Sequence, residues 1–115
     1  YELGKILKKQ TIFSERVNGE FKLRRGFEIK KGDKVLIVED VITTGKSSLE
    51  CSKLVTMSKA NIAGYACIID RSNNKSEIKG KIVSQLKLNI PTYDKDNIPD
   101  ELLSIKAVKP GSRNL

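Results

Sequence analysis

The chain has 115 residues, 38% hydrophobic and 31% charged, a composition that predicts one globular domain or part of one. Its net charge of +8 comes from 22 Lys and Arg against 14 Asp and Glu, but the lysines are scattered and do not form a basic run that would predict nucleic-acid binding. The chain has no histidine, which excludes a His-based catalytic relay or a Cys/His metal site within it. No apolar run approaches the roughly 18 residues of a membrane span, and we expect a cytoplasmic protein.

The first elements are a helix and a hairpin. Residues 1–9 carry apolar side chains at helical spacing but no preceding cap or initiator methionine, so we interpret Tyr1 as an interior position of a longer chain. A short strand is predicted at 11–14 and a return strand at 21–24. Between them, Asn-Gly in the turn 17–20 supplies the positive φ angles of a tight hairpin.

A turn at 31–33 precedes the most informative stretch. The apolar and β-branched run 35–38 is typical of a parallel strand covered on both faces. A loop at 43–48 follows, and then a predicted helix at 49–58. Its buried face would use Leu54, Val55 and Met57.

The remaining elements complete an open sheet. Residues 62–69 predict a second buried strand, 81–88 a third strand and 96–104 a weaker final helix. Strand, helix and strand in this order indicate a right-handed crossover and a parallel α/β sheet. Cys51 and Cys67 fall in a predicted helix and strand, and their number and spacing indicate reduced, partly buried thiols.

Two acids and a hydroxyl-rich loop follow the first buried strand, where open parallel sheets bind ligands. The loop 43–48 opens a helix, so its backbone N–H groups and hydroxyls converge and favour an anion such as a phosphate monoester. Glu39 and Asp40 are suited to accept hydrogen bonds from a vicinal diol or to orient water around Mg²⁺. A phosphate beside a diol describes a ribose 5-phosphate.

Other interpretations of this segment remain open. Ser47 and Glu50 match a capping box, which would make the loop only a helix start. A Walker P-loop is disfavoured because Asp40 stands where that motif requires glycine.

Segment 35–47, Val-Leu-Ile-Val-Glu-Asp-Val-Ile-Thr-Thr-Gly-Lys-Ser, resembles the signature for 5-phosphoribosyl 1-pyrophosphate (PRPP) in type I phosphoribosyltransferases. Segments 12–16 and 23–29 resemble the mobile-loop hairpin of the orotate phosphoribosyltransferases. Segments 69–72 and 108–113 are similar to that family's later strand and tail. The resemblance covers nearly all of this chain but only about the last half of a typical member.

The resemblance implies a fold and a division of the chain. We expect an α/β domain with an open parallel sheet flanked by helices, of which residues 1–115 are the C-terminal portion. A β-hairpin mobile loop would span residues 11–30, and the PRPP-binding strand, loop and helix residues 34–59. The family's pyrophosphate loop and N-terminal orotate-binding elements lie outside this portion, so we expect the 115 residues alone to be inactive.

The implied reaction transfers the phosphoribosyl group of PRPP to N1 of orotate, giving orotidine 5′-monophosphate and pyrophosphate with Mg²⁺, in de novo pyrimidine (UMP) biosynthesis. No residue is expected to bind the metal directly, because Mg²⁺ would travel with the substrate pyrophosphate. Arg71 would contact orotate, since a planar fork of donors suits an anionic acceptor, and Thr43 would lie near orotate as well. The other interpretation of Arg71 is a surface charge paired with Asp70. The implied PRPP-binding residues are Glu39, Asp40, Val41, Ile42, Thr43, Thr44, Gly45, Lys46 and Ser47.

Cationic side chains that close over the departing pyrophosphate would stabilise its growing negative charge. In the family the loop of one subunit completes its neighbour's site, which implies a homodimer with shared active sites. The loop of the best-known branch carries a histidine that this chain lacks, and Lys46 stands where many relatives have a small residue. The alternative is an ordinary solvated basic hairpin. The candidate cations are Arg16, Lys22, Arg24 and Arg25.

Two other functions are compatible with parts of the sequence. One is a purine phosphoribosyltransferase of the same fold, which Arg71 and the segment 27–29 disfavour. The other is a non-catalytic regulator that senses PRPP and uses its positive charge on nucleic acid. The sequence contains no separate nucleic-acid-binding element, so we expect neither a nucleic-acid nor a membrane partner.

Overall fold

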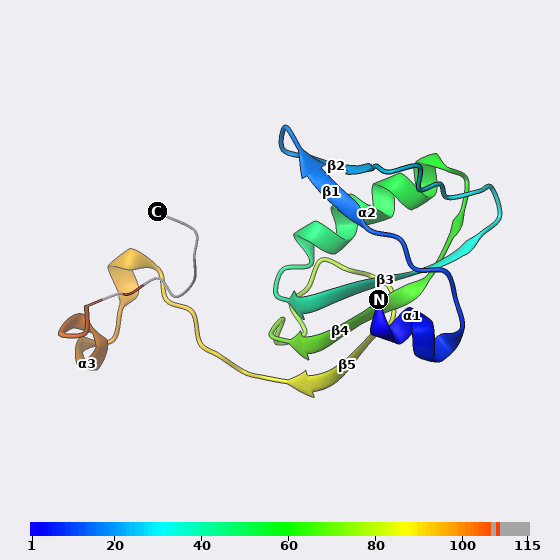
Figure 1. Cartoon of the computed structure of the whole chain (residues 1–115). Helices are drawn as coiled ribbons and strands as arrows, with labels where there is room; N and C mark the ends of the chain where they lie inside the picture. The colour runs from blue at the N-terminus through cyan, green and yellow to red at the C-terminus, as the bar shows by residue number, and fades with distance from the viewer. Residues whose placement is uncertain (107, 109–115) are drawn as a thin grey trace.

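A three-stranded parallel sheet forms the centre of the computed structural model, which describes residues 1–106 and 108. Its strands are β3 (Lys34–Ile42), β4 (Asn61–Asp70) and β5 (Ile82–Lys87), hydrogen-bonded in that order. The three arrows point the same way in Figure 1, so their carboxyl ends share one edge of the sheet. The predicted open parallel α/β sheet is confirmed.

Helix α2 (Lys46–Met57) connects β3 to β4 and covers one face of the sheet. Val55 is buried with Ile37 and Tyr65 in the core between helix and sheet. The Ser52 hydroxyl donates to the Ser48 carbonyl at 2.8 Å, so the Tyr65 hydroxyl donates to Ser52, also at 2.8 Å. This polar link fixes the first turns of α2 against β4.

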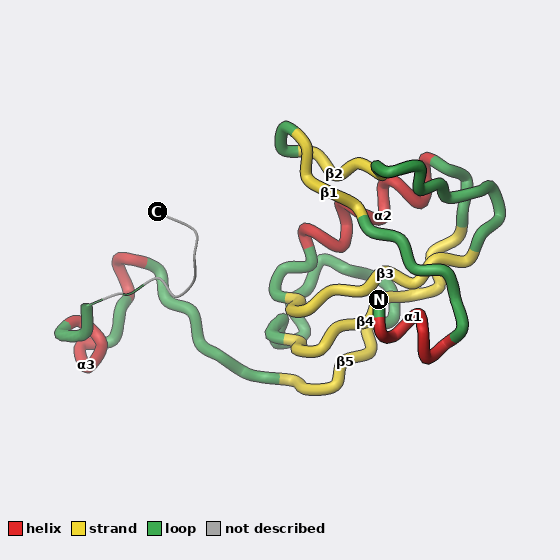
Figure 2. Tube along the Cα trace, in the orientation of Figure 1, coloured by secondary structure: helices red, strands yellow, loops and turns green. Residues whose placement is uncertain are grey.

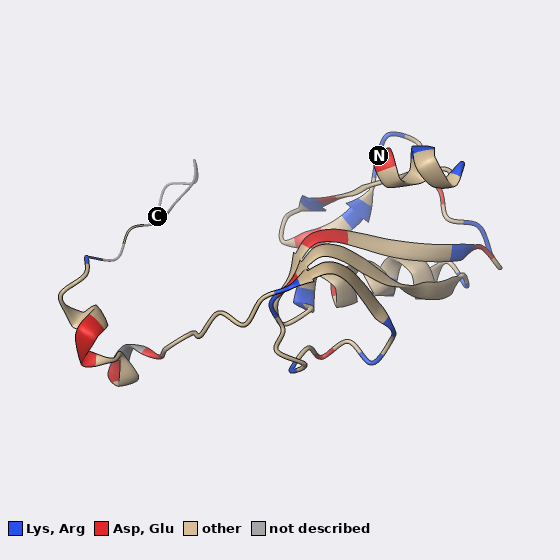
Figure 3. Cartoon of the chain, turned by 90° about the horizontal axis from the view of Figure 1, so that it is seen from below, with Lys and Arg blue, Asp and Glu red and all other residues tan. Residues whose placement is uncertain are grey.

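The opposite face of the sheet is only partly covered. Figures 1 and 3 place α1 (Glu2–Leu7) on that side, across the sheet from α2. Leu36 is 40% exposed, Val38 53% and Ile68 61%. The prediction that strand 35–38 is covered on both faces is therefore wrong for this chain, because alternate side chains of β3 stay exposed among the described residues even though α1 lies on that side.

The hairpin forms a third layer, on the outer side of α2. Strands β1 (Ser14–Val17) and β2 (Glu20–Leu23) pair antiparallel, and β2 contacts α2. Figure 2 shows the two strands above the helix. Asn18 and Gly19 have φ angles of 51° and 85°, which confirms the predicted tight turn. The first strand begins at Ser14 rather than residue 11, after Phe13 stacks edge-on against Phe27 with ring centroids 5.0 Å apart.

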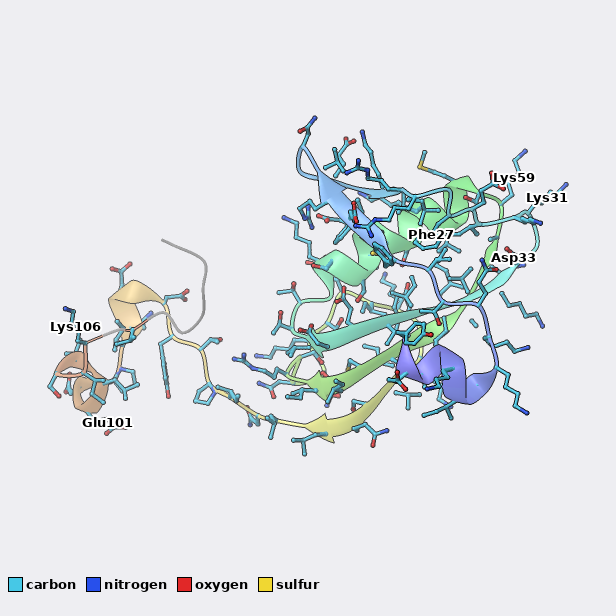
Figure 4. The ribbon with its side chains drawn as sticks, in the orientation of Figure 1. Phe27, Lys31, Asp33, Lys59, Glu101 and Lys106 are labelled. Carbon is cyan, nitrogen blue, oxygen red and sulfur yellow. The ribbon has the colours of Figure 1, made fainter. Side chains whose placement is uncertain are left out.

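The far end of the sheet is closed by the predicted turn at 31–33. The Gly32 N–H donates to the Lys59 carbonyl at 3.0 Å, and the Asn61 N–H donates to the Asp33 carbonyl at 2.7 Å. Figure 4 labels Lys31, Asp33 and Lys59 together at this end. The end of α2 is thereby anchored away from the carboxyl edge of the strands.

Three predicted helix details differ from the structure. Helix α2 starts at Lys46, three residues before the predicted start at residue 49. The side chain of Met57 is 80% exposed, so Met57 is not part of the buried face. The final helix is split into η1 (Lys95–Asn97) and α3 (Asp100–Leu103) because Pro99 interrupts it.

The segment after β5, which includes α3, extends away from the sheet in Figure 1. The similarity noted at 108–113 lies outside the described residues, apart from Val108. Among the described residues, no helix has both the length and the apolar character needed to cross a membrane.

Candidate functional site

The acidic pair lies inside β3, not after it. β3 continues to Ile42 because the β-branched Val41 and Ile42 keep pairing with Ile69 and Asp70 of β4. The predicted strand end at Val38 is therefore too early. The pair still reaches the carboxyl edge of the sheet, where Figure 3 shows acidic residues at the ends of the strands.

The two carboxylates have different surroundings. Successive strand residues point to opposite faces, and Glu39 is half-buried beside Cys67 while Asp40 is exposed. Burial, and secondarily the charge of Asp40, raises the pKa of Glu39 above its ordinary value of 4.5. Asp40 Oδ1 accepts the Val41 N–H at 2.7 Å. The remaining carboxylate oxygens can accept hydrogen bonds from ligand hydroxyls on either side of the strand end.

Residues 43–47, which we call the hydroxyl turn, connect β3 to α2. Residues 39–48 line a hollow of about 160 Å³, so the acids and the turn share one cavity. Gly45 is the N-cap of α2 with φ 84°, a left-handed conformation that favours glycine. No side chain caps the helix, and Glu50 is paired with Arg16 instead. The capping-box interpretation of Ser47 and Glu50 is therefore wrong.

The start of α2 presents free donors to this hollow. The Lys46 N–H makes a long contact of 3.3 Å to Thr44 Oγ1, and the N–H groups of Gly45, Ser47 and Ser48 donate to no other group among the described residues. Lys46 and Ser47 have exposed side chains, whereas Ser48 is only 1% exposed. Converging N–H groups, hydroxyls and a lysine at a helix start can bind a dianionic phosphate.

Arg71 lies beside this site but does not line the hollow. Its N–H donates to the Ile42 carbonyl at 2.8 Å, which ties it to the end of β3. Its Nε is buried without a hydrogen-bond partner. Asp70 accepts the Ser72 N–H at 2.9 Å, and the Ser72 hydroxyl and N–H lower the pKa of Asp70. Within the described residues Arg71 forms no ion pair, so the interpretation as a partner of Asp70 is wrong and its guanidinium remains available for an anion.

The four hairpin cations lie outside the hollow and pair with acids of this chain. Arg16 donates to Glu50 of α2 and to the Gly19 carbonyl, and its guanidinium lies 4.4 Å from the Phe21 ring centroid. The other ion pairs are Lys22 with Glu20 at 3.8 Å, Arg24 with Glu15 at 3.4 Å and Arg25 with Glu15 at 3.0 Å.

Sequence reasoning missed the residues behind the hydroxyl turn. The Glu77 N–H donates to the Thr44 carbonyl at 3.0 Å, and the Ser76 hydroxyl donates to the same carbonyl at 3.3 Å. No signal in the sequence identified Ser76 and Glu77 as hydrogen-bond partners of Thr44.

Both cysteines are free thiols, as predicted. Cys51 is half-buried in α2, with its sulfur 3.3 Å from Ser14 Oγ, and Cys67 is buried in β4. Burial raises the pKa of both, which keeps them protonated and poor nucleophiles. Among the described residues, no group of three or more acidic, cysteine or histidine side chains could hold a metal ion.

The sheet, the crossover helix and the polar turn at its start define an open-sheet α/β domain of the type I phosphoribosyltransferase fold. Adenine phosphoribosyltransferase from Thermoanaerobacter pseudethanolicus superposes with a TM-score of 0.58 at 16% identity, over 76% of this chain and 61% of that one. The enzyme of the same name from Rhodothermus marinus gives 0.56 at 19% identity, over 76% and 61%. At this identity the likeness concerns the fold alone.

The model of the phosphoribosyl transferase domain family matches residues 4–102, and the chain belongs to this family. It is similar to orotate phosphoribosyltransferases from Maricaulis maris, at 42% identity, and from Bartonella henselae, at 44%, each over 115 residues. In both cases the match covers 100% of this chain and 59% of the relative. The chain thus spans less than two thirds of these relatives and corresponds to their C-terminal part.

Proposed function

We propose that the protein is an orotate phosphoribosyltransferase and that this chain supplies its PRPP-binding segment. The observation that carries the proposal is 40–44% identity, over nearly the whole chain, to curated proteins of that name. The reaction would join N1 of orotate to C1′ of the ribose while the bond from C1′ to pyrophosphate breaks. Orotate loses its N1 proton, and pyrophosphate leaves with the bonding electrons.

The hollow supports ribose 5-phosphate as the part of PRPP bound here. The hydroxyl turn offers unpaired N–H groups and exposed hydroxyls to the 5-phosphate. Glu39 and Asp40 line the same hollow and would accept hydrogen bonds from the two ribose hydroxyls. Val41 and Ile42 would shape the floor, since Ile42 is only 2% exposed. Together these contacts would hold C1′ still while its bond to pyrophosphate breaks.

Arg71 supports an anionic acceptor. A buried guanidinium nitrogen without a partner carries a desolvation cost that an incoming carboxylate would offset. Arg71 directly follows the last residue of β4, and its backbone N–H is hydrogen-bonded to the end of β3. Its side chain would therefore approach the sugar from the strand next to β3. We assign it to the orotate carboxylate, with Thr43 nearby.

Mg²⁺ is the cofactor we propose, carried by the pyrophosphate of PRPP. The residues present fit this role, because adjacent carboxylates can orient water around an ion that the substrate phosphates hold directly. Two adjacent carboxylates are present, and the described residues contain no larger ligand cluster. When bound, the ion neutralises negative charge on the pyrophosphate.

The hairpin would act on a second copy of the protein. Arg16, Lys22, Arg24 and Arg25 are exposed but lie outside their own hollow, which is consistent with a role at a neighbouring site in a homodimer. Closing such cations over pyrophosphate would stabilise its developing charge and exclude water. We accordingly propose a dimer with shared active sites in the cytoplasm.

An acceptor-competition assay tests the proposal. Full-length protein is incubated with PRPP, Mg²⁺ and equal concentrations of orotate, hypoxanthine, adenine and uracil, and the nucleotide products are separated. We expect orotidine 5′-monophosphate to dominate. A purine nucleotide as the main product would overturn the orotate assignment and leave the phosphoribosyltransferase family intact. The isolated 115 residues should show no turnover in the same assay.

A further inference from the structure

The loop between β4 and β5, residues 71–81, packs behind the hydroxyl turn. The Arg71 N–H ties it to the end of β3 through the Ile42 carbonyl at 2.8 Å, and the Glu77 N–H ties it to the hydroxyl turn through the Thr44 carbonyl at 3.0 Å. The turn therefore has one side toward the hollow and the other toward this loop.

The Ser76 hydroxyl adds a second, longer hydrogen bond to the peptide of the turn that the Glu77 N–H also holds. It donates its single proton to the Thr44 carbonyl at 3.3 Å and accepts the Ile78 N–H at 3.1 Å. The two lone pairs of the Thr44 oxygen are thus used by Ser76 and Glu77. In a trans peptide the C=O and the following N–H point in opposite directions. Holding the Thr44 carbonyl toward the loop therefore turns the Gly45 N–H away from it, so that it is free to bind an anion.

Steric contact reinforces this arrangement. A Cβ on Gly45 would lie 2.6 Å from Ser76 Oγ and 2.7 Å from Ile78 Cγ1. Ile78 is buried in the hydrophobic core, so the loop cannot yield without disturbing that core. The turn thus packs closely against a surface formed by the Ser76 hydroxyl and the buried Ile78 side chain.

We propose that Ser76 is a positioning residue for phosphate binding: it orients the Thr44–Gly45 peptide so that the hydroxyl turn is preorganised for the 5-phosphate. The inference rests on the proposed function, because it assumes that the turn binds that phosphate. Ser76 itself does not line the hollow, so it would act through the turn rather than by contacting the phosphate. Its effect is on donor affinity rather than on bond breaking.

The test is ribose 5-phosphate binding by full-length protein, measured by titration calorimetry for Ser76→Ala and Ser76→Thr. Losing one hydrogen bond that orients the turn should weaken binding roughly fivefold in Ser76→Ala. Ser76→Thr keeps the hydroxyl and should bind within about twofold of the unsubstituted protein. In steady-state assays Ser76→Ala should raise the KM for PRPP and leave kcat at saturating donor within about twofold.

Ser58→Ala is the matched control. Ser58 also donates its hydroxyl to a backbone carbonyl, that of Leu54 at 3.0 Å, but at the far end of α2. Each alanine variant loses one hydrogen bond from a serine hydroxyl to a backbone carbonyl, so a small fall in Tm is expected for both. The affinity for ribose 5-phosphate should fall only in Ser76→Ala.

The outcomes distinguish a failure of the positioning role of Ser76 from a failure of the proposed function. If the unsubstituted protein binds ribose 5-phosphate and Ser76→Ala binds equally well, the positioning role is wrong and the proposed function stands. Equal weakening in Ser58→Ala, or a fall in kcat with unchanged KM for PRPP, also overturns the positioning role. If the unsubstituted protein binds no ribose 5-phosphate, the proposed function fails and this inference fails with it.

Discussion

Replacing Gly45 by alanine probes the tight contact between the hydroxyl turn and the loop behind it. The added Cβ would lie 2.6 Å from Ser76 Oγ and 2.7 Å from Ile78 Cγ1, at a residue whose φ is +84°. The left-handed conformation costs a non-glycine residue about 1–2 kcal/mol, and forcing a methyl group into packed surroundings costs about 1–3 kcal/mol more. We therefore expect Gly45→Ala to lower the free energy of unfolding by about 2–5 kcal/mol and to abolish measurable ribose 5-phosphate binding.

Gly32 provides a matched control for the free-energy cost of placing a non-glycine residue in the left-handed conformation. Its φ is +86°, nearly that of Gly45, but a Cβ there would meet nothing within 4 Å. Gly32→Ala should therefore lower the free energy of unfolding by only about 1–2 kcal/mol. Its ligand binding should be unchanged, because residue 32 lies at the opposite end of the sheet.

The assay is urea denaturation of both variants in full-length protein, with calorimetric titration of ribose 5-phosphate. The difference between the two variants isolates the steric contact from the conformational cost. Equal destabilisation by both substitutions, or normal binding by Gly45→Ala, would refute the tight approach of the turn to its supporting loop.

Three further predictions concern the charged residues around the site. Arg71→Lys should raise the KM for orotate about tenfold or more, since an ammonium group cannot reproduce a planar fork, and should leave the Kd of ribose 5-phosphate unchanged; a shift in both constants would contradict a role specific to the acceptor. The pKa of Glu39 is raised, so this carboxyl becomes protonated at a higher pH than an ordinary one. The ionised carboxylate is the form that accepts hydrogen bonds from the ligand hydroxyls. Affinity for ribose 5-phosphate should therefore decline as pH falls toward that pKa, and Glu39→Gln should lack this part of the pH profile; identical profiles would exclude Glu39 from the sugar contacts. Glu50→Gln removes the ion pair between Glu50 and Arg16, which is worth up to about 1 kcal/mol. Amide hydrogen exchange in the hairpin should therefore speed up by as much as about fivefold. Unchanged exchange would mean that this ion pair does not restrain the hairpin.

The sequence predicted features that depend on local chemistry. The tight turn could be predicted because Asn18 and Gly19 tolerate positive φ, and this preference needs no tertiary contact. The cavity at the end of β3 could be predicted because paired acids and a hydroxyl-rich helix start adjoin in the chain. A hollow formed by one continuous segment is visible in sequence order.

Features that depend on distant partners could not be predicted. The end of β3 lies at Ile42 rather than Val38 because β4 supplies partners for three more residues, Glu39, Val41 and Ile42. Ser76 was missed because it lies 32 positions from Thr44, its hydrogen-bond partner, and the segment around it has no periodic pattern. The buried and unpaired state of Arg71 likewise depends on packing that the sequence does not state.

The central claim is that the hydroxyl turn holds a sugar phosphate while Glu39 and Asp40 hold the sugar hydroxyls. A crystal structure of the full-length protein with ribose 5-phosphate tests it most directly. We predict phosphate oxygens within hydrogen-bonding distance of the Gly45 and Ser47 N–H groups, with both carboxylates accepting from the ribose. A ligand bound elsewhere, with the turn empty and the two carboxylates directed away from any sugar, would contradict the account.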